Sequence, residues 1–210
     1  MSKIIYRELA LVIFAIFLTG CVKPIPLVNT DISSLGPVEL VMVETPKIQV
    51  ATLGGLFLQS LGGLLTAPVG VAVNENASKK VKDGVVLLDF GGLVMKHFSE
   101  RVEKEIPNWP KMTIRDRPVN GDYKSGDGNQ LEFRVDKWGV AGRYFYSLTI
   151  GTLKNPNGKI IWQKAFSYHS STYKRGRVLE EFLADNGKLL KEEIAFAADL
   201  SVSDFIDHLN

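Results

Sequence analysis

The sequence predicts an α+β fold, with helices packed on one face of a mostly antiparallel sheet that contains a three-strand meander, after a signal peptide and a tether. Two observations predict it. Three runs of alternating apolar and polar residues follow one another between residues 131 and 168, as expected for antiparallel strands. Two further segments, near residue 90 and at the carboxyl terminus, repeat apolar residues every three or four positions, which indicates amphipathic helices.

The amino-terminal segment MSKIIYRELALVIFAIFLTGC has the layout of an export signal. Lys3 and Arg7 make its start basic, and residues 9–18 form an apolar stretch of about ten residues, too short to cross a bilayer. The stretch ends in Leu18-Thr19-Gly20-Cys21, where a Leu and two small residues precede the only cysteine of the chain. This motif resembles the lipobox of bacterial lipoproteins. The alternative is an uncleaved amino-terminal anchor with a chance cysteine.

The resemblance implies a lipid anchor. In bacterial lipoproteins the cysteine thiol receives a diacylglycerol and a peptidase cuts before the cysteine, so we expect cleavage between Gly20 and Cys21. The covalent lipid on Cys21 is the only cofactor expected. Val22 follows instead of Asp, which within the family implies the outer membrane, on its periplasmic face, if the source is Gram-negative. We therefore expect a signal peptide at 1–20, the acylated cysteine and a flexible tether at 21–37, and one periplasmic domain at 38–210.

The first elements of the domain are a strand and a helix. Alternation in VELVMVE predicts a strand over 38–44. Asp89 is the expected N-cap of a helix that ends before Pro107, and its apolar stripe is Phe90, Val94, Phe98 and Val102. A short strand is expected at 111–115.

The second half predicts the meander and two more helices. Its strands are the runs 131–141, 143–153 and 159–168. Lys154-Asn155-Pro156-Asn157-Gly158 predicts a hairpin turn, because Pro fixes φ and Asn-Gly supplies a left-handed residue. The helices are expected at 178–184 and, after an interruption at Asp185-Asn186-Gly187, along an apolar stripe from Leu190 to Leu209.

An uncharged run, residues 48–74, lies between the first strand and the first helix. It is long enough to span a membrane but is broken by repeated glycines, with Gly54, Gly55, Gly62 and Gly63 as the candidate packing or oligomer surface. We expect a buried or self-packing helical hairpin. The alternatives are an exposed surface for oligomers or partners, and a membrane span or membrane-inserting hairpin.

Composition argues against several functions. Lys and Arg number 25 against 23 Asp and Glu, a net charge of +2 without a basic stripe, so no nucleic-acid partner is expected. A single cysteine excludes internal disulfides and thiolate zinc sites. His97, His169 and His208 lack metal-ligand spacing, so neither a metal nor catalytic residues are predicted, with a dispersed triad around His169 as the alternative. Residues 122–129 have calcium-loop residue types but no closing Glu.

Aromatic residues concentrate in the meander. Those that face inward are core, and a strand face could instead expose a stripe to a ligand; the candidates are Trp138, Tyr144, Tyr146 and Trp162.

These observations favour a non-enzymatic, membrane-anchored periplasmic lipoprotein that is a structural or accessory component of the cell envelope. Its expected partners are the membrane, through the lipid, and envelope proteins or further copies of itself. The order strand, helix, meander, helix loosely resembles outer-membrane accessory lipoproteins of secretion and envelope-transport machines. The alternatives are a module that binds a glycan, a lipid or peptidoglycan, and an envelope hydrolase without a recognisable motif.

Overall fold

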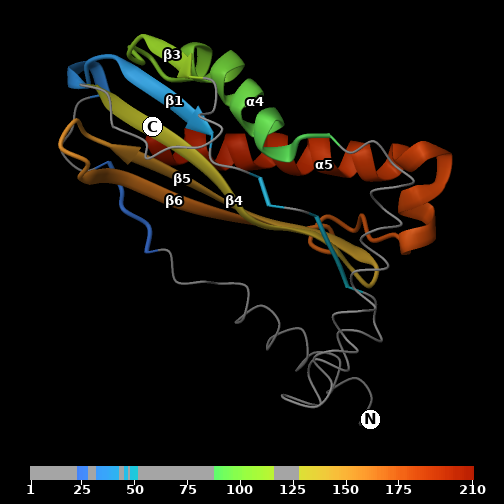
Figure 1. Cartoon of the computed structure of the whole chain (residues 1–210). Helices are drawn as coiled ribbons and strands as arrows, with labels where there is room; N and C mark the ends of the chain where they lie inside the picture. Colours follow the sequence, from blue (N-terminus) through green and yellow to red (C-terminus); the bar gives the residue numbers. More distant parts are fainter. Residues whose placement is uncertain (1–22, 28–31, 43–44, 47, 52–87, 116–127) are drawn as a thin grey trace.

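The structure is a computed structural model that describes residues 23–27, 32–42, 45–46, 48–51, 88–115 and 128–210. It is an α+β fold in which two helices pack on a six-stranded sheet (Figure 1). The helices are α4 (Phe90–Glu105) and α5 (Leu179–Leu209), and a single 3₁₀ turn, η1 (Ile32–Ser34), precedes the sheet. The strands are β1 (Val38–Met42), β2 (Gln49–Ala51), β3 (Met112–Arg115), β4 (Asn129–Ala141), β5 (Tyr144–Lys154) and β6 (Ile160–His169).

The sheet has the order β3-β1-β4-β5-β6, and β2 pairs with the other end of β4. Strands β4, β5 and β6 form an antiparallel meander, which confirms that prediction. The prediction of a mostly antiparallel sheet is wrong, because β1 pairs in parallel with both β3 and β4, and β2 in parallel with β4. Parallel neighbours need a crossover connection, and α4 lies in the connection between β1 and β3. The sheet is therefore mixed.

Both helices pack on the same face of the sheet, as predicted (Figure 1). Phe98 of α4 meets Phe133 of β4 with ring centroids 4.9 Å apart, and Phe205 of α5 stacks on the same Phe133 at 5.3 Å. All three rings are at most 1 % exposed. One aromatic residue of the central strand β4 therefore joins the two helices to the sheet.

Strand β4 keeps its apolar residues on the helix face by means of a bulge. Leu131, Phe133 and Val135 alternate inward, and the pairing with β5 then shifts by one residue between Val135 and Lys137. After the shift Trp138 and Val140 are buried, while Lys137 is exposed. Without the extra residue, the two apolar side chains would point away from the helices.

Helix α5 is kinked where the sequence predicted an interruption. Asp185, Asn186 and Gly187 have φ angles of 52°, 57° and 72°, a left-handed conformation that Asp, Asn and Gly tolerate best. Leu190, Ile194 and Phe205, on the longer part of α5, are fully buried, which confirms the predicted apolar stripe.

Part of the expected tether belongs to the domain. Ile25 forms an isolated antiparallel bridge with Gln163 of β6, and Leu35 is 5 % exposed within the hydrophobic core. Residues 25–27 and 32–37 are thus not a free spacer, because their backbone and apolar side chains find partners on the folded domain. The stretch 21–37 was predicted to be flexible from its content of Pro, Ser and Asn. Composition alone does not reveal contacts between such a stretch and the folded domain.

The start of the uncharged run is a strand and not the expected helix, because Gln49–Ala51 pairs with β4 as β2. Its four candidate glycines, Gly54, Gly55, Gly62 and Gly63, lie outside the described residues, as do Gly20 and Cys21 of the lipobox. Among the helices that the structure describes, none has both the length and the apolar character needed to cross a membrane.

Candidate binding pocket

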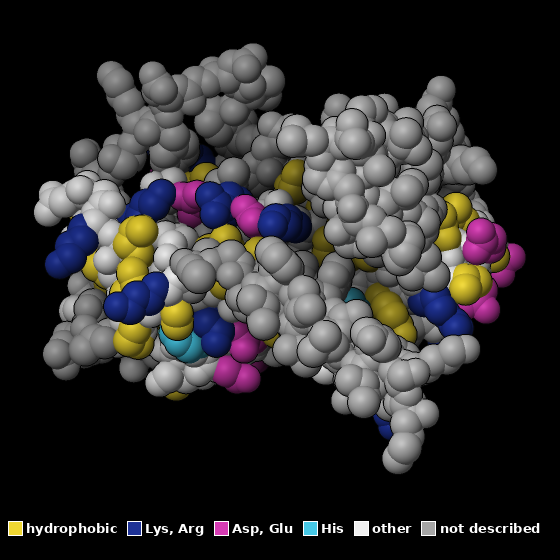
Figure 2. Space-filling view, turned by 90° about the horizontal axis from the view of Figure 1, so that it is seen from below, with side chains coloured by type: hydrophobic (Ala, Val, Ile, Leu, Met, Phe, Trp, Pro, Cys, Tyr) yellow, Lys and Arg dark blue, Asp and Glu magenta, His cyan; other side chains and the backbone are white. Residues whose placement is uncertain are grey.

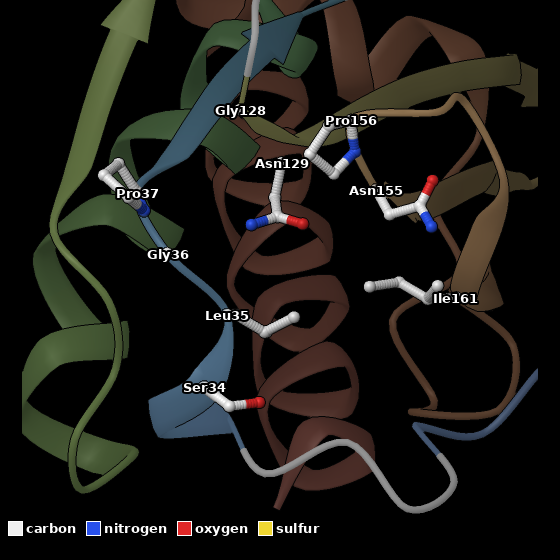
Figure 3. A pocket seen from close by; sticks show the side chains of 9 residues that line it. All are labelled: Ser34, Leu35, Gly36, Pro37, Gly128, Asn129, Asn155, Pro156 and Ile161. Carbon is white, nitrogen blue, oxygen red and sulfur yellow. The ribbon is translucent and has the colours of Figure 1, made fainter.

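One end of the sheet carries a pocket between η1 and the turn that joins β5 to β6 (Figure 3). We call it the hairpin pocket; its volume is about 490 Å³. Four separate stretches of the chain meet there, and the lining residues are Ser34, Leu35, Gly36, Pro37, Gly128, Asn129, Asn155, Pro156 and Ile161. In Figure 3 the side chains of Leu35 and Ile161 point toward each other across the space.

Asn129 is the polar group at the centre of the hairpin pocket. It is the first residue of β4 and is 8 % exposed, so more than nine-tenths of it is buried. Figure 3 shows its amide between Gly36 on one side and Pro156 on the other. Its side chain makes no hydrogen bond to any residue that the structure describes, and its amide atoms are not fully buried, so they are accessible from the pocket.

The wall of the pocket opposite η1 is the turn between β5 and β6, which internal hydrogen bonds hold. The Oδ1 atom of Asn155 accepts hydrogen bonds from the backbone N–H groups of Asn157 (3.1 Å) and Lys159 (3.0 Å). Gly158, with a φ of 75°, completes the turn, as predicted from the Asn-Pro-Asn-Gly sequence. Because these bonds occupy the Oδ1 atom of Asn155, Asn129 is the lining amide whose oxygen and nitrogen both lack a partner among the described residues.

The hairpin pocket was not predicted from the sequence. The sequence-based predictions assign its residues separately to the tether, to the end of a loop, to the hairpin turn and to the strand 159–168. Their meeting depends on the parallel pairing of Val38 with Asn129, which no periodicity in the sequence reports. The sequence offered no separate signal for Asn129, which lies within the polar and glycine-rich run 124–130 before the predicted strand.

The predicted ligand-facing aromatics are mostly interior. Trp138, Tyr146 and Trp162 are 4 %, 9 % and 0 % exposed, and only Tyr144, at 37 %, is exposed among the four. Trp138 Nε1 donates to the carbonyl oxygen of Pro46 (2.6 Å), and the Tyr146 hydroxyl donates to Gln49 Oε1 (3.1 Å). These rings fasten the segment around β2 to the sheet, so they do not form the exposed stripe that was considered.

The three histidines lie in different environments and do not meet. His169 Nδ1 is 2.5 Å from Ser171 Oγ, a contact within the turn after β6, and burial lowers the pKa of His169. His208 Nδ1 accepts a hydrogen bond from Trp162 Nε1 (3.0 Å). His97 lies on α4, 3.9 Å from Asp199. The described residues contain no group of three or more side chains that could hold a metal ion.

A buried carboxylate, which sequence reasoning missed, lies under the loop after β6. Glu193 of α5 is 3 % exposed, accepts a short hydrogen bond from the Tyr168 hydroxyl, and pairs with Arg175 at 2.8 Å. Burial and the contact with Glu193 raise the pKa of Tyr168 above its ordinary range. The Arg175 guanidinium also lies 4.5 Å from the ring centroid of Phe196. This cluster joins α5, β6 and the loop, and it does not line the hairpin pocket.

Several surface charges are paired with a charge of opposite sign. Figure 2, seen from below, shows dark blue and magenta side chains side by side, not gathered by sign. On the face of the sheet away from the helices, Lys154 pairs with Glu132 at 2.5 Å and Arg115 with Glu39 at 2.6 Å. On the face that Figure 2 shows, the described charged side chains therefore form no extended patch of one sign.

Among solved structures, three chains match this one. No protein-family model matches the chain, and no curated protein matches it. A solved structure described as "Crystal structure of uncharacterized protein" is similar with a TM-score of 0.37 and 8 % identity, over 84 % of this chain and 91 % of that one. At this level the likeness carries no argument about function.

Proposed function

We propose that the chain is a non-enzymatic lipoprotein, anchored by a lipid on Cys21 to the periplasmic face of the outer membrane, whose α+β domain binds other components of the cell envelope. The observation that carries the proposal is the sequence Leu18-Thr19-Gly20-Cys21, placed directly after an apolar stretch and holding the only cysteine of the chain. Lipidation would consume a thiol that is otherwise reactive in an oxidising compartment.

The position of Ile25 supports a close association between anchor and domain. Ile25 is bound to Gln163 through the backbone and follows Cys21 by only four residues. An extended chain spans at most about 3.6 Å per residue, so the lipid-bearing residue would lie within about 14 Å of this point on β6. Such an anchor would hold the β6 edge of the domain near the bilayer.

The polar clusters of the domain support a binding role over a catalytic one. The Glu193 cluster and the pair of Trp162 with His208 each join α5 to β6, which is a structural task. The contact of His169 with Ser171 spans two residues of one turn. Among the described residues, the hairpin pocket holds the Asn129 amide and no charged side chain.

Metabolic labelling with a palmitate analogue tests the anchor. The wild-type chain should carry the label and sediment with membranes, whereas Cys21→Ser should lose both. Ser99→Ala, a substitution of similar size on α4, is the control and should behave as wild type. Label-free wild-type protein that stays in the soluble fraction would refute the lipid anchor.

The binding role is tested separately by affinity purification of the labelled wild-type protein from detergent-solubilised envelopes, followed by cross-linking and native mass measurement. We expect a defined complex, either with another envelope protein or with further copies of the chain. A strict monomer that purifies alone would contradict an accessory role, even if Cys21 is acylated.

A further inference from the structure

We propose that the hairpin pocket binds a short, uncharged, extended peptide segment, which the Asn129 amide contacts through one donor and one acceptor. The inference names a partner class for the domain and does not require that Cys21 be acylated. The two proposals can therefore fail independently.

The unpaired amide of Asn129 is the first argument. A side-chain amide offers a carbonyl acceptor and an N–H donor side by side, the same pair that a backbone peptide group presents. The Asn129 amide has no hydrogen-bond partner among the described residues and is accessible from the pocket, so a ligand in the pocket can pair with both its donor and its acceptor. Asn129 is 8 % exposed and its amide lies in the space of the hairpin pocket (Figure 3).

The composition of the walls is the second argument, because the described lining residues suit an uncharged aliphatic ligand. None of the nine described lining residues is charged, so a phosphate, carboxylate or ammonium group would find no counter-charge among them. None is aromatic, so a sugar ring would find no surface to stack on. Two proline rings and the aliphatic side chains of Leu35 and Ile161 instead suit an apolar side chain of a peptide.

Size sets the length of the segment. The volume of about 490 Å³ lies within the roughly 300–1,000 Å³ of small-ligand sites. A helix has a diameter of about 10–12 Å with its side chains and would not fit a cavity of this volume. An extended stretch of a few residues fits, with one peptide group on Asn129 and one aliphatic or proline side chain between Leu35 and Ile161.

Gly36 provides a way to fill the pocket without disturbing the fold. A Cβ atom added there would lie 4.0 Å from Asn129 Nδ2, an ordinary van der Waals contact, and would meet no other atom within that distance. Gly36→Ala therefore adds a methyl group beside the amide. Gly128 is less suitable, because a Cβ there would come within 3.3 Å of the Pro37 carbonyl oxygen.

The test uses the full chain, immobilised, and a phage-displayed library of random short peptides. We expect enrichment of uncharged sequences that contain aliphatic residues or proline. Synthetic peptides from that selection should bind Asn129→Leu and Asn129→Asp at least about tenfold more weakly than wild type, since each variant removes one or both hydrogen bonds. Gly36→Ala should weaken binding with unchanged urea unfolding, which separates lost contacts from lost folding.

Asn157→Leu, at the exposed tip of the same hairpin, is the matched control and should bind as wild type. Three results would overturn the proposal: no enriched peptide whose binding depends on Asn129, enrichment confined to charged sequences, or equal affinity for the wild type and Gly36→Ala. If inorganic phosphate or N-acetylglucosamine competes with the selected peptides at equal concentration, the assigned ligand class is wrong.

Discussion

Ile25 and Gln163 exchange two backbone hydrogen bonds, Ile25 N–H to the Gln163 carbonyl at 2.8 Å and Gln163 N–H to the Ile25 carbonyl at 2.9 Å. This pair attaches the amino-terminal segment to the edge strand of the sheet, on the side of the molecule away from α4 (Figure 1). If Cys21 carries the lipid, the bridge determines which edge of the domain approaches the bilayer.

The orientation can be measured with fluorophores on introduced cysteines, because the proposed acylation would occupy the native one. A probe on Ser167→Cys, an exposed position on β6, should be quenched by lipids that carry a quencher on their acyl chains. The matched probe on Glu103→Cys, exposed on α4 in the helix layer, should be quenched several-fold less. Equal quenching at both positions in acylated protein would show that the bridge does not orient the domain.

Removing the Tyr168 hydroxyl should destabilise the domain. Tyr168→Phe takes a hydrogen bond from the buried Glu193 carboxylate, so we expect a loss of about 1–3 kcal/mol in the free energy of unfolding measured with urea. Tyr173→Phe is the control, since Tyr173 stacks on Tyr168 at 5.3 Å but is 41 % exposed. It should change stability by less than about 0.5 kcal/mol. Equal losses in both variants would assign the effect to ring packing instead of the hydroxyl.

Tyr146 should make the fold sensitive to alkali. Burial raises the pKa of Tyr146 from 10.0 to about 12, so the folded state keeps a proton that the unfolded state loses first. The stabilisation is complete below pH 10 and is lost as pH rises through 12. Unfolding free energies measured across this window should fall less steeply in Tyr146→Phe, and the phenolate absorbance of Tyr146 should appear late in an alkaline titration. A phenolate at its ordinary pH in folded protein would contradict the burial argument.

His208 should make the domain sensitive to acid. Its Nδ1 accepts the Trp162 indole proton, which requires a neutral ring, and burial followed by the nearby Lys164 lowers the pKa of His208, with Asp204 opposing. A lowered folded pKa gives stability that is present above the ordinary value of 6.5 and is lost as pH falls through the folded value.

We expect the free energy of unfolding to be lower at about pH 5 than at about pH 7.5. His208 should contribute less than about 1 kcal/mol to this difference, because its ring is partly exposed. His208→Gln retains an acceptor that does not titrate and should reduce the difference. His169→Gln should reduce it by a separate amount, since burial also lowers the pKa of His169. An unchanged pH difference in His208→Gln would refute the role of the Trp162 contact.

The sequence predicted best those helices and strands that bury one face in the core, because such an element repeats apolar residues at a regular spacing. Phe90, Val94 and Phe98 share the buried face of α4, and Leu131, Phe133 and Val135 that of β4, so local spacing was sufficient. The parallel pairing of β1 was beyond such reasoning, because five residues have the same alternation in either direction. The hairpin pocket depends on that pairing, and so it could not be predicted either. Strand β2, only three residues long, has no periodicity to detect.

Gly139 shows how closely β2 lies on β4, and its substitution tests where the uncharged run begins. A Cβ at Gly139 would stand 1.8 Å from the Gln49 carbonyl oxygen and 2.7 Å from its carbon, both backbone atoms. Because no flexible side chain can yield, Gly139→Ala must push β2 away from the sheet, at a cost of roughly 1–3 kcal/mol.

Hydrogen exchange of the amides in β2 (Gln49–Ala51) should accelerate in Gly139→Ala, since their pairing with β4 is lost. Gly158→Asn is the matched control: nothing lies within 4 Å of its Cβ, and Asn tolerates the φ of 75° at that position. It should leave both exchange and stability nearly unchanged. Unaltered exchange in Gly139→Ala would mean that β2 is not held against β4 in solution. The hydrogen bond from Tyr146 to Gln49 of β2 would then not form either.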